Sequence, residues 1–121
     1  MEITIKKIFL NWEEFSEGIE ILTKLIKTSK FKFDGIYAPP RGGLPLAVAM
    51  SHRLNIPLLL SPTEKTLVVD DIIDTGETLH KFRKNKIPTI YSTKWTITKP
   101  TWWIWEKEKK THWIIFPWEK L

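Results

Sequence analysis

One stretch of twelve residues, 67–78 (LVVDDIIDTGET), constrains this chain more than any other. Its apolar beginning predicts a strand over residues 66–70 that is buried on both faces, as strands of parallel sheets are. The strand delivers two adjacent acids, Asp70 and Asp71, and then a turn that leads into a helix. A buried strand that ends in two acids predicts a polar site at its carboxyl end, because ligands of open α/β sheets bind there.

The turn itself, DTGET, has the composition of a phosphate site. Gly76 permits backbone geometry that a side chain would block. Successive N–H groups at a helix start, together with the hydroxyls of Thr75 and Thr78, can surround a phosphate. Paired acids beside a phosphate are expected to hold sugar hydroxyls or a cation, and a ribose diol and Mg²⁺ are the partners with the right chemistry.

The rest of the chain alternates between helical and strand patterns. Asn11 and Glu14 form a capping-box-like start to an amphipathic helix that runs to about residue 29. We further expect strands at 34–38, 56–60 and 88–93, helices at 44–54 and 77–85, and short strands or a hairpin-like cap in the aromatic tail, 101–121. This order predicts an α/β fold: a single domain over residues 1–121 with a mostly parallel sheet, flanking helices and a small C-terminal aromatic cap.

Composition narrows the class of ligand and the compartment. The net charge of +5 suits anionic ligands, and the chain has no cysteine, so neither disulfides nor thiol catalysis is expected. We find neither a signal peptide nor an apolar run long enough to span a bilayer, and we expect a cytoplasmic protein with no membrane partner. The three histidines lack metal-ligand spacing. Five of the seven tryptophans follow residue 100.

The 67–78 stretch resembles the phosphoribosyl-pyrophosphate (PRPP) signature of type I phosphoribosyltransferases, and the likeness extends from Trp12 to Glu119. The resemblance implies that Asp70 and Asp71 address the ribose hydroxyls, with Asp71 reaching Mg²⁺ through water. It implies that Asp74, Thr75, Gly76, Glu77 and Thr78 hold the 5′-phosphate. Asp74 would also sit near purine N7 and take its proton.

A second segment, Pro-Pro-Arg-Gly-Gly at residues 39–43, resembles the pyrophosphate loop of the same family. In that role Gly42 and Gly43 would let backbone amides approach the pyrophosphate, while Arg41 would add a charged donor and act in catalysis. The resemblance also implies a strained peptide bond immediately before Arg41.

Two stretches resemble the xanthine-guanine, or 6-oxopurine, branch. Lys94 ends a strand whose terminal lysine contacts the 6-oxo group of the base. The tail HWIIFPWE resembles the C-terminal base-binding element, in which Trp113 would stack on the base and Ile114 would offer backbone groups. The alternative for Trp113 is that it only fills the core.

The resemblance therefore implies a purine-salvage glycosyltransferase. Its substrates would be PRPP and guanine, xanthine or hypoxanthine, its products a nucleoside monophosphate and pyrophosphate, and its cofactor Mg²⁺. It also implies a homodimer, with which the aromatic excess is compatible.

One departure from the family leaves two rival functions open. Only residues 61–65 join the second strand to the acidic strand, where the family usually has a long mobile loop that closes over the reacting centre. Catalysis could therefore be weak or absent, and the alternative is a regulatory protein of the same fold that binds nucleotides or PRPP without turnover. A second alternative, which we do not favour, is a nucleic-acid-binding protein that uses basic charge and stacking tryptophans.

Overall fold

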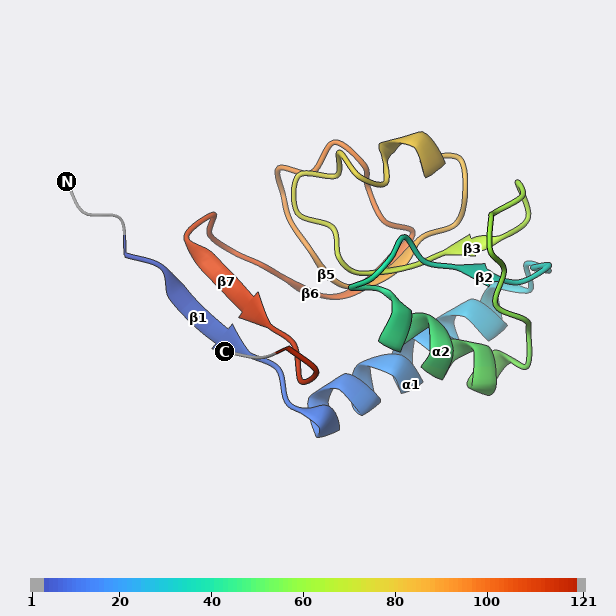
Figure 1. The fold of residues 1–121 in the computed structure, drawn as a ribbon, viewed down its shortest axis with the longest axis horizontal. Helices are drawn as coiled ribbons and strands as arrows, with labels where there is room; N and C mark the ends of the chain where they lie inside the picture. Colours follow the sequence, from blue (N-terminus) through green and yellow to red (C-terminus); the bar gives the residue numbers. More distant parts are fainter. Residues whose placement is uncertain (1–3, 120–121) are drawn as a thin grey trace.

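The computed structural model describes residues 4–119 of the chain (Figure 1). Two helices, one short 3₁₀ turn and seven strands follow one another over these residues. In chain order they are β1 (Lys6–Phe9), α1 (Trp12–Ser29), β2 (Ile36–Tyr37), α2 (Leu44–Leu54), β3 (Leu67–Val68), β4 (Asp70–Ile72), η1 (His80–Phe82), β5 (Pro88–Ser92), β6 (Trp102–Glu106) and β7 (His112–Ile115). The expected alternation of strands and helices is confirmed, and every strand pair in the described part of the chain is parallel.

The central strand is formed by β3 and β4 together. β3 pairs with β2, while β4 pairs with β5, and β5 pairs with β6. Between β3 and β4 the Val69 amide donates to the Tyr37 carbonyl (2.9 Å), and just after β4 the Ile73 amide donates to the Tyr91 carbonyl (3.0 Å). The strand is therefore flanked on both edges by other strands.

Both helices cover one face of this sheet (Figure 1). α1 begins as its sequence predicts: the Asn11 side chain accepts from the Glu14 amide (2.7 Å), and the Glu14 side chain accepts from the Asn11 amide (3.1 Å). Its apolar stripe packs against α2 and the strands, where Leu22, Met50 and Ile90 are fully buried. A smaller cluster under η1 covers the opposite face, so the central strand is enclosed from both sides.

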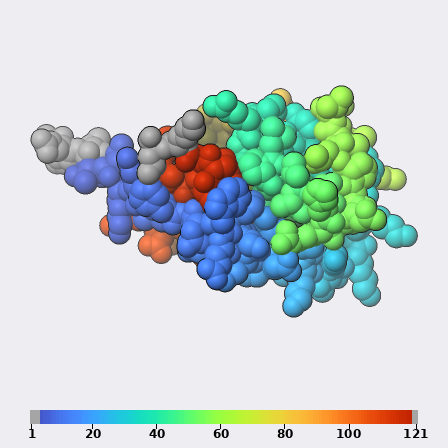
Figure 2. All heavy atoms as spheres, turned by 60° about the horizontal axis from the view of Figure 1, so that its bottom comes forward, coloured from blue at the N-terminus to red at the C-terminus, as the bar shows by residue number. Residues whose placement is uncertain are grey.

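The aromatic tail does not form a hairpin. β6 extends the sheet alongside β5, and β7 pairs in parallel with β1, at the other end of the sequence. The tail then turns back, and Figure 2 shows its last described residues set against the start of α1. There Trp118 stacks on Phe116 (ring centroids 5.2 Å apart) and meets the edge of Phe15 (5.0 Å). These contacts form the small aromatic cap that the sequence predicts.

Two predicted elements are shorter than expected. The helix predicted at 77–85 is reduced to η1, and the Gly76 carbonyl, which an α-helix would offer to the His80 amide, accepts from the Thr98 hydroxyl (2.5 Å). The His80 amide donates instead to the Glu77 carbonyl (3.3 Å). The strand predicted at 56–60 is reduced to a single bridge at Leu58 on the edge of the sheet.

Neither helix within residues 4–119 combines the length and the apolar character needed to cross a bilayer.

The packing of α1 can be tested with two leucines of the same helix. Leu22 is 0% exposed and Leu25 is 42% exposed. We expect Leu22→Ala to lower the free energy of unfolding by about 2–5 kcal/mol, because it leaves a cavity under the sheet. Leu25→Ala is the matched control and should cost well under half as much. Equal losses in a urea titration would contradict the described packing.

Candidate active site

Two polar segments meet beyond the carboxyl end of the central strand, as the sequence predicts. The loop after β2 brings Arg41 and Gly42 beside Asp71, and together with Trp118 and Glu119 they line an open cavity of about 700 Å³. Arg41 is exposed on this loop, and the Pro40–Arg41 peptide bond is cis. An unusual peptide bond immediately before Arg41 is what the resemblance to pyrophosphate loops implies.

The loop's glycines are needed because it lies directly against the strand. A Cβ atom at Gly43 would stand 2.9 Å from the Val69 carbonyl oxygen and 3.0 Å from the Asp70 Cα, both backbone atoms that cannot move aside. A Cβ at Gly42 would stand 3.0 Å from an Asp71 carboxylate oxygen. The two glycines therefore bring the loop's backbone within reach of whatever Asp71 binds.

Asp70 and Asp71 line different cavities, although their carboxyl groups are close enough for a hydrogen bond between them. Asp71 faces the Arg41 loop, whereas Asp70 lines a cavity of about 140 Å³ together with Asp74, Thr75, Gly76 and Thr78. The acidic pair thus stands between the two segments that the sequence analysis associates with phosphate groups.

Asp70 and Asp71 lie in surroundings that disfavour the charged form of a carboxyl group. Burial and, after it, the neighbouring Asp71 together raise the pKa of Asp70 to about 8. Burial also raises the pKa of Asp71, and the charge of Glu119 acts in the same direction. One oxygen of each carboxylate accepts a bond from a backbone amide: Asp70 from the Asp71 amide (2.9 Å) and Asp71 from the Ile72 amide (2.8 Å). A cation or several hydroxyl donors at this point would stabilise the charged forms.

The donor set fits Mg²⁺ only when a ligand contributes oxygens. Adjacent carboxylates are the hard oxygen donors that Mg²⁺ takes, commonly one or two of them with substrate phosphates. Over residues 4–119, no cluster of three or more His, Asp or Glu side chains is arranged to hold a metal alone.

The turn after the strand is fixed by the segment that follows β5. Gly76 has a φ of 83°, and a Cβ there would lie 2.3 Å from the Thr96 hydroxyl oxygen, so both conformation and space require glycine. The Thr75 carbonyl accepts from the Ile97 amide (2.8 Å). Thr75 and Thr78 themselves are exposed, and their hydroxyls are accessible to a ligand.

A third cavity, of about 110 Å³, is lined by Asp74, Trp113, Ile114, Ile72 and Lys107. Trp113 is 57% exposed, so it does not act as a core plug. The carbonyls of Thr111 and Ile115 accept hydrogen bonds from the β1 side of β7. The backbone groups of alternate residues in a strand point to opposite edges, so those of Ile114 point away from β1. The Ile114 backbone is therefore free of β1, as the base-binding role would need.

The structure does not bring Lys94 to this cavity. Lys94 is exposed and lines a separate cavity of about 280 Å³ with Thr96, Lys99 and Trp103, among others. Its contact with a base therefore stays a prediction.

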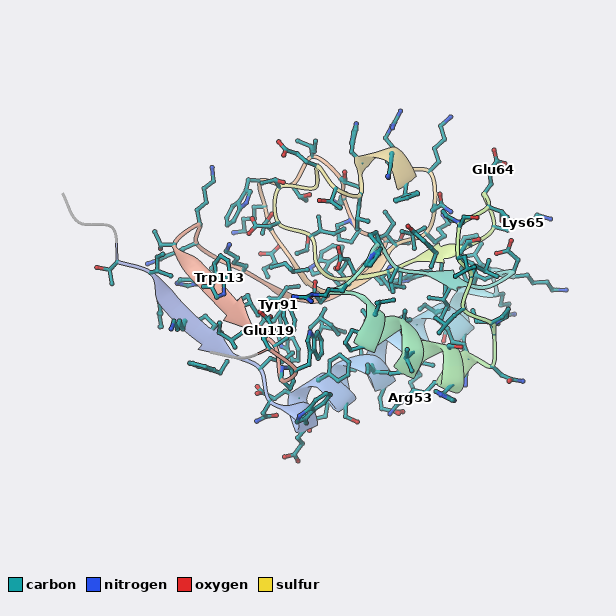
Figure 3. The ribbon with its side chains drawn as sticks, viewed as in Figure 1. Arg53, Glu64, Lys65, Tyr91, Trp113 and Glu119 are labelled. Atoms are coloured by element: carbon teal, nitrogen blue, oxygen red, sulfur yellow. The ribbon has the colours of Figure 1, made fainter. Side chains whose placement is uncertain are left out.

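Four residues around the site were not singled out as site residues by the sequence: Trp95, Lys107, Trp118 and Glu119. Lys107 lies in a run of charged residues, and nothing in that run distinguishes it from its neighbours. Figure 3 shows Glu119 and Trp113 in the same half of the molecule, remote from Arg53, Glu64 and Lys65.

The raised pKa values predict how stability depends on pH. The folded protein keeps protons on Asp70 and Asp71 above pH 4 that the unfolded chain releases, so its stability should fall as pH rises from about 5 to about 8. Asp70→Asn should flatten this slope and raise the free energy of unfolding at pH 8 by at least about 1.4 kcal/mol, the equivalent of one pKa unit. Thermal unfolding of the ligand-free protein at several pH values measures both effects.

The exposed Glu64 provides the control, since Glu64→Gln should leave the slope unchanged. If Asp70→Asn keeps the wild-type slope, the acidic pair is not held in the environment described here.

Comparison with known proteins agrees with this geometry. No protein-family model matches the chain. A xanthine-guanine phosphoribosyltransferase of Idiomarina loihiensis is 28% identical over an alignment of 145 residues that covers 94% of this chain and 88% of the relative. The alignment is longer than the chain, so the relative contains residues that this chain lacks.

Two solved structures share the fold. A purine phosphoribosyltransferase from Pyrococcus horikoshii superimposes with a TM-score of 0.81 and 28% identity, over 97% of this chain and 96% of that one. A Neisseria gonorrhoeae protein solved with bound ppGpp has a TM-score of 0.76 and 19% identity, over 99% and 93% of the two chains. With the acidic strand, the glycine loop and the 74–78 turn assembled as described, the chain is similar in sequence and fold to type I phosphoribosyltransferases, and in particular to their xanthine-guanine branch.

Proposed function

We propose that this protein is a purine phosphoribosyltransferase that transfers the 5-phosphoribosyl group from PRPP to a 6-oxopurine, with release of pyrophosphate. One observation carries the proposal: Asp70 and Asp71 stand between a glycine loop on one side and a phosphate turn on the other, with an aromatic-lined cavity next to the turn. Pyrophosphate, ribose 5-phosphate and base would occupy these three cavities in that order.

The first two cavities would hold PRPP. The amides and hydroxyls of the 74–78 turn would bind the 5′-phosphate, with Glu77 contributing its backbone, and the two acids would bind the ribose hydroxyls. Arg41 and the amides of Gly42 and Gly43 would bind pyrophosphate. Mg²⁺ held between Asp71, through water, and the substrate's oxygens would neutralise charge on the leaving group.

The third cavity would hold the base. Trp113 would stack on the purine, the free edge of Ile114 would meet its 2-substituent, and Asp74 would accept the proton from N7. Lys94 could contact the 6-oxo group only by reaching across from its own cavity.

Transfer needs stabilisation of the leaving group and alignment of the two reactants. As the bond from C1 to pyrophosphate breaks, C1 gains positive character and the pyrophosphate gains negative charge. Arg41 and the loop amides would stabilise that negative charge. The rigid turn and Trp113 would hold C1 and N9 of the base in line, which lowers the entropic part of the barrier.

We extend the proposal to a homodimer in the cytoplasm. Large apolar side chains are exposed at Ile5, Phe9 and Trp12, near the β1–β7 pair, and such a group supports self-association. A cytoplasmic location follows from the proposed substrates.

The turnover assay measures pyrophosphate release with PRPP, Mg²⁺ and guanine, xanthine, hypoxanthine or adenine. We expect release with the three 6-oxopurines and none above background for Asp70→Asn combined with Asp71→Asn, because that variant loses the sugar and cation ligands. PRPP should also give no titration heat with the double variant, while Glu64→Gln should behave as wild type. No release with any base, or an unchanged PRPP titration in the double variant, would contradict the proposal.

A second candidate function is a nucleotide-binding regulator without turnover. The shortness of the 61–65 connection favours it, because this connection replaces the mobile loop that usually closes over the reacting centre. This connection is a tight turn: the Thr66 hydroxyl donates to Asp34 (2.7 Å), the Thr63 hydroxyl donates to the same carboxylate, and the Asn85 amide donates to the Thr63 carbonyl (2.9 Å). It lies far from Trp113 and Glu119 and cannot cover the site (Figure 3).

The Pyrococcus protein weighs against this second candidate, since this chain covers 96% of a structure described as a purine phosphoribosyltransferase. The two functions differ in one assay. A regulator would bind PRPP or a guanosine nucleotide, with ppGpp included because the Neisseria protein holds it, and would release no pyrophosphate with any base.

A further inference from the structure

We propose that His80 positions the 74–78 turn for a sugar phosphate, and that it acts through the buried hydroxyl of Thr98. This inference rests on the proposed function, because it assigns the support of that function's 5′-phosphate site. It arises from two consecutive hydrogen bonds that end on the turn, one between His80 and Thr98 and one between Thr98 and the backbone of Gly76. His80 is therefore a positioning residue, which acts on the turn from behind.

The Thr98 hydroxyl donates its proton to Gly76. Thr98 is 2% exposed, and its Oγ1 lies 2.5 Å from the Gly76 carbonyl oxygen and 3.2 Å from Nδ1 of His80. A hydroxyl has one proton and a carbonyl oxygen can only accept, so the proton of Thr98 belongs to the shorter bond. Toward His80 the same hydroxyl can then act only as an acceptor.

The direction of this proton fixes the tautomer of His80. A ring nitrogen that faces an acceptor must carry a proton, so the neutral ring is the Nδ1–H form. Free histidine prefers the Nε2–H form, in which Nδ1 is a bare acceptor. In that form the Thr98 proton would turn toward the ring, and the Gly76 carbonyl would lose its partner. The tautomer of one exposed side chain thus decides whether the turn is bonded from behind.

The bond to Gly76 aims a backbone donor of the turn. In a trans peptide the carbonyl and the N–H point in opposite directions, so holding the Gly76 carbonyl at Thr98 turns the Glu77 N–H the other way. There the Glu77 amide donates to the Thr75 hydroxyl (3.3 Å), and Thr75 lines the cavity proposed for the 5′-phosphate. A carbonyl that accepts a hydrogen bond also makes the N–H of its peptide a stronger donor. The two bonds therefore orient and strengthen one donor for phosphate.

His80 can support Thr98 because its own backbone is fixed. The preceding residue, Leu79, is 2% exposed and belongs to the apolar cluster under η1. The His80 carbonyl accepts twice from Arg83, once from the backbone amide (3.1 Å) and once from the guanidinium group (3.0 Å). The η1 turn thus holds the imidazole beside residues 96–98, next to the turn in space although Thr98 lies 18 residues further along the chain.

Two pairs of substitutions test the inference. His80→Leu and Thr98→Val each remove one member of the chain of bonds. His80→Asn keeps an amide donor near the position of Nδ1, and Thr98→Ser keeps the hydroxyl. His52→Leu, at an exposed position of α2, is the matched control for the loss of a histidine. Calorimetric titration with ribose 5-phosphate and, separately, with pyrophosphate and Mg²⁺ measures the two phosphate sites without requiring turnover.

The tautomer has its own spectroscopic signature. A long-range proton–nitrogen NMR spectrum of the histidine rings, recorded in alkaline buffer, distinguishes the Nδ1–H form from the Nε2–H form. We expect His80 to be Nδ1–H in the wild-type protein and the exposed His52 to be mainly Nε2–H. Thr98→Val should return His80 to mainly Nε2–H and leave His52 unchanged, an effect that a purely structural role of His80 does not produce.

We expect His80→Leu and Thr98→Val to weaken ribose 5-phosphate binding about 3-fold to 10-fold, the usual effect of one neutral hydrogen bond, with pyrophosphate binding changed less than about twofold. In turnover, KM for PRPP should rise and KM for hypoxanthine should not. His80→Asn and Thr98→Ser should retain most of the affinity, and His52→Leu should behave as wild type. Because His80 is exposed, its variants keep the test available should Thr98→Val unfold.

Three results would overturn the inference. The first is an Nε2–H tautomer at His80 in the wild-type protein, and the second is unchanged ribose 5-phosphate binding in folded His80→Leu. The third is an equal loss of ribose 5-phosphate and pyrophosphate binding, which would mark a general disturbance of the site. Wild-type protein that binds ribose 5-phosphate but releases no pyrophosphate with any base would defeat the proposed enzyme activity and leave the role of His80 intact. Wild-type protein that binds neither ribose 5-phosphate nor PRPP would defeat both.

Discussion

The structure of the site depends on two neighbouring carboxylates that the sheet removes from water. The strand formed by β3 and β4 is paired on both edges and covered on both faces, so Asp70 and Asp71 at its carboxyl end are largely desolvated. Their raised pKa values express the cost of charge at that point, and Glu119 adds to it on the Asp71 side. A cation and sugar hydroxyls would offset this cost, so the folded chain carries a built-in preference for a ligand that supplies them.

The surrounding loops are rigid because they are packed against backbone. Gly43 lies against the strand, Gly76 lies against residues 96–98, and the Thr98 hydroxyl donates to the Gly76 carbonyl. Trp95, Lys107 and Asp74 then join the turn to the ends of β5 and β6. These contacts within the protein hold the segments of the site in place without a ligand. Such preorganisation is needed here because the short 61–65 connection does not cover the site.

The parts that the sequence predicts correctly are those decided by local chemistry. The capping box and apolar stripe identify α1, the breaker cluster and Pro45 identify the start of α2, and the acidic strand with its glycine turn locates the two cavities that Asp70 and Asp71 line. The parts it misses depend on long-range pairing. Nothing near residue 113 indicates that β7 pairs with β1, and nothing near residue 107 indicates which lysine of a charged run becomes buried. Lys94 illustrates the same limit, since its place at a strand end does not determine where its side chain lies.

The pairing of β7 with β1 ties Trp113 and the cavity proposed for the base to the first strand of the described residues. Among residues 4–119, β1 is the one strand that pairs with β7, through a register of four residues. A two-stranded ribbon of this length frays far more readily than the enclosed sheet beside it. Local opening would carry Trp113 away from Asp74 while leaving the acidic pair and the phosphate turn in place. In the proposed enzyme, this difference in local stability would give the base a route of entry and exit that does not require release of the sugar phosphate.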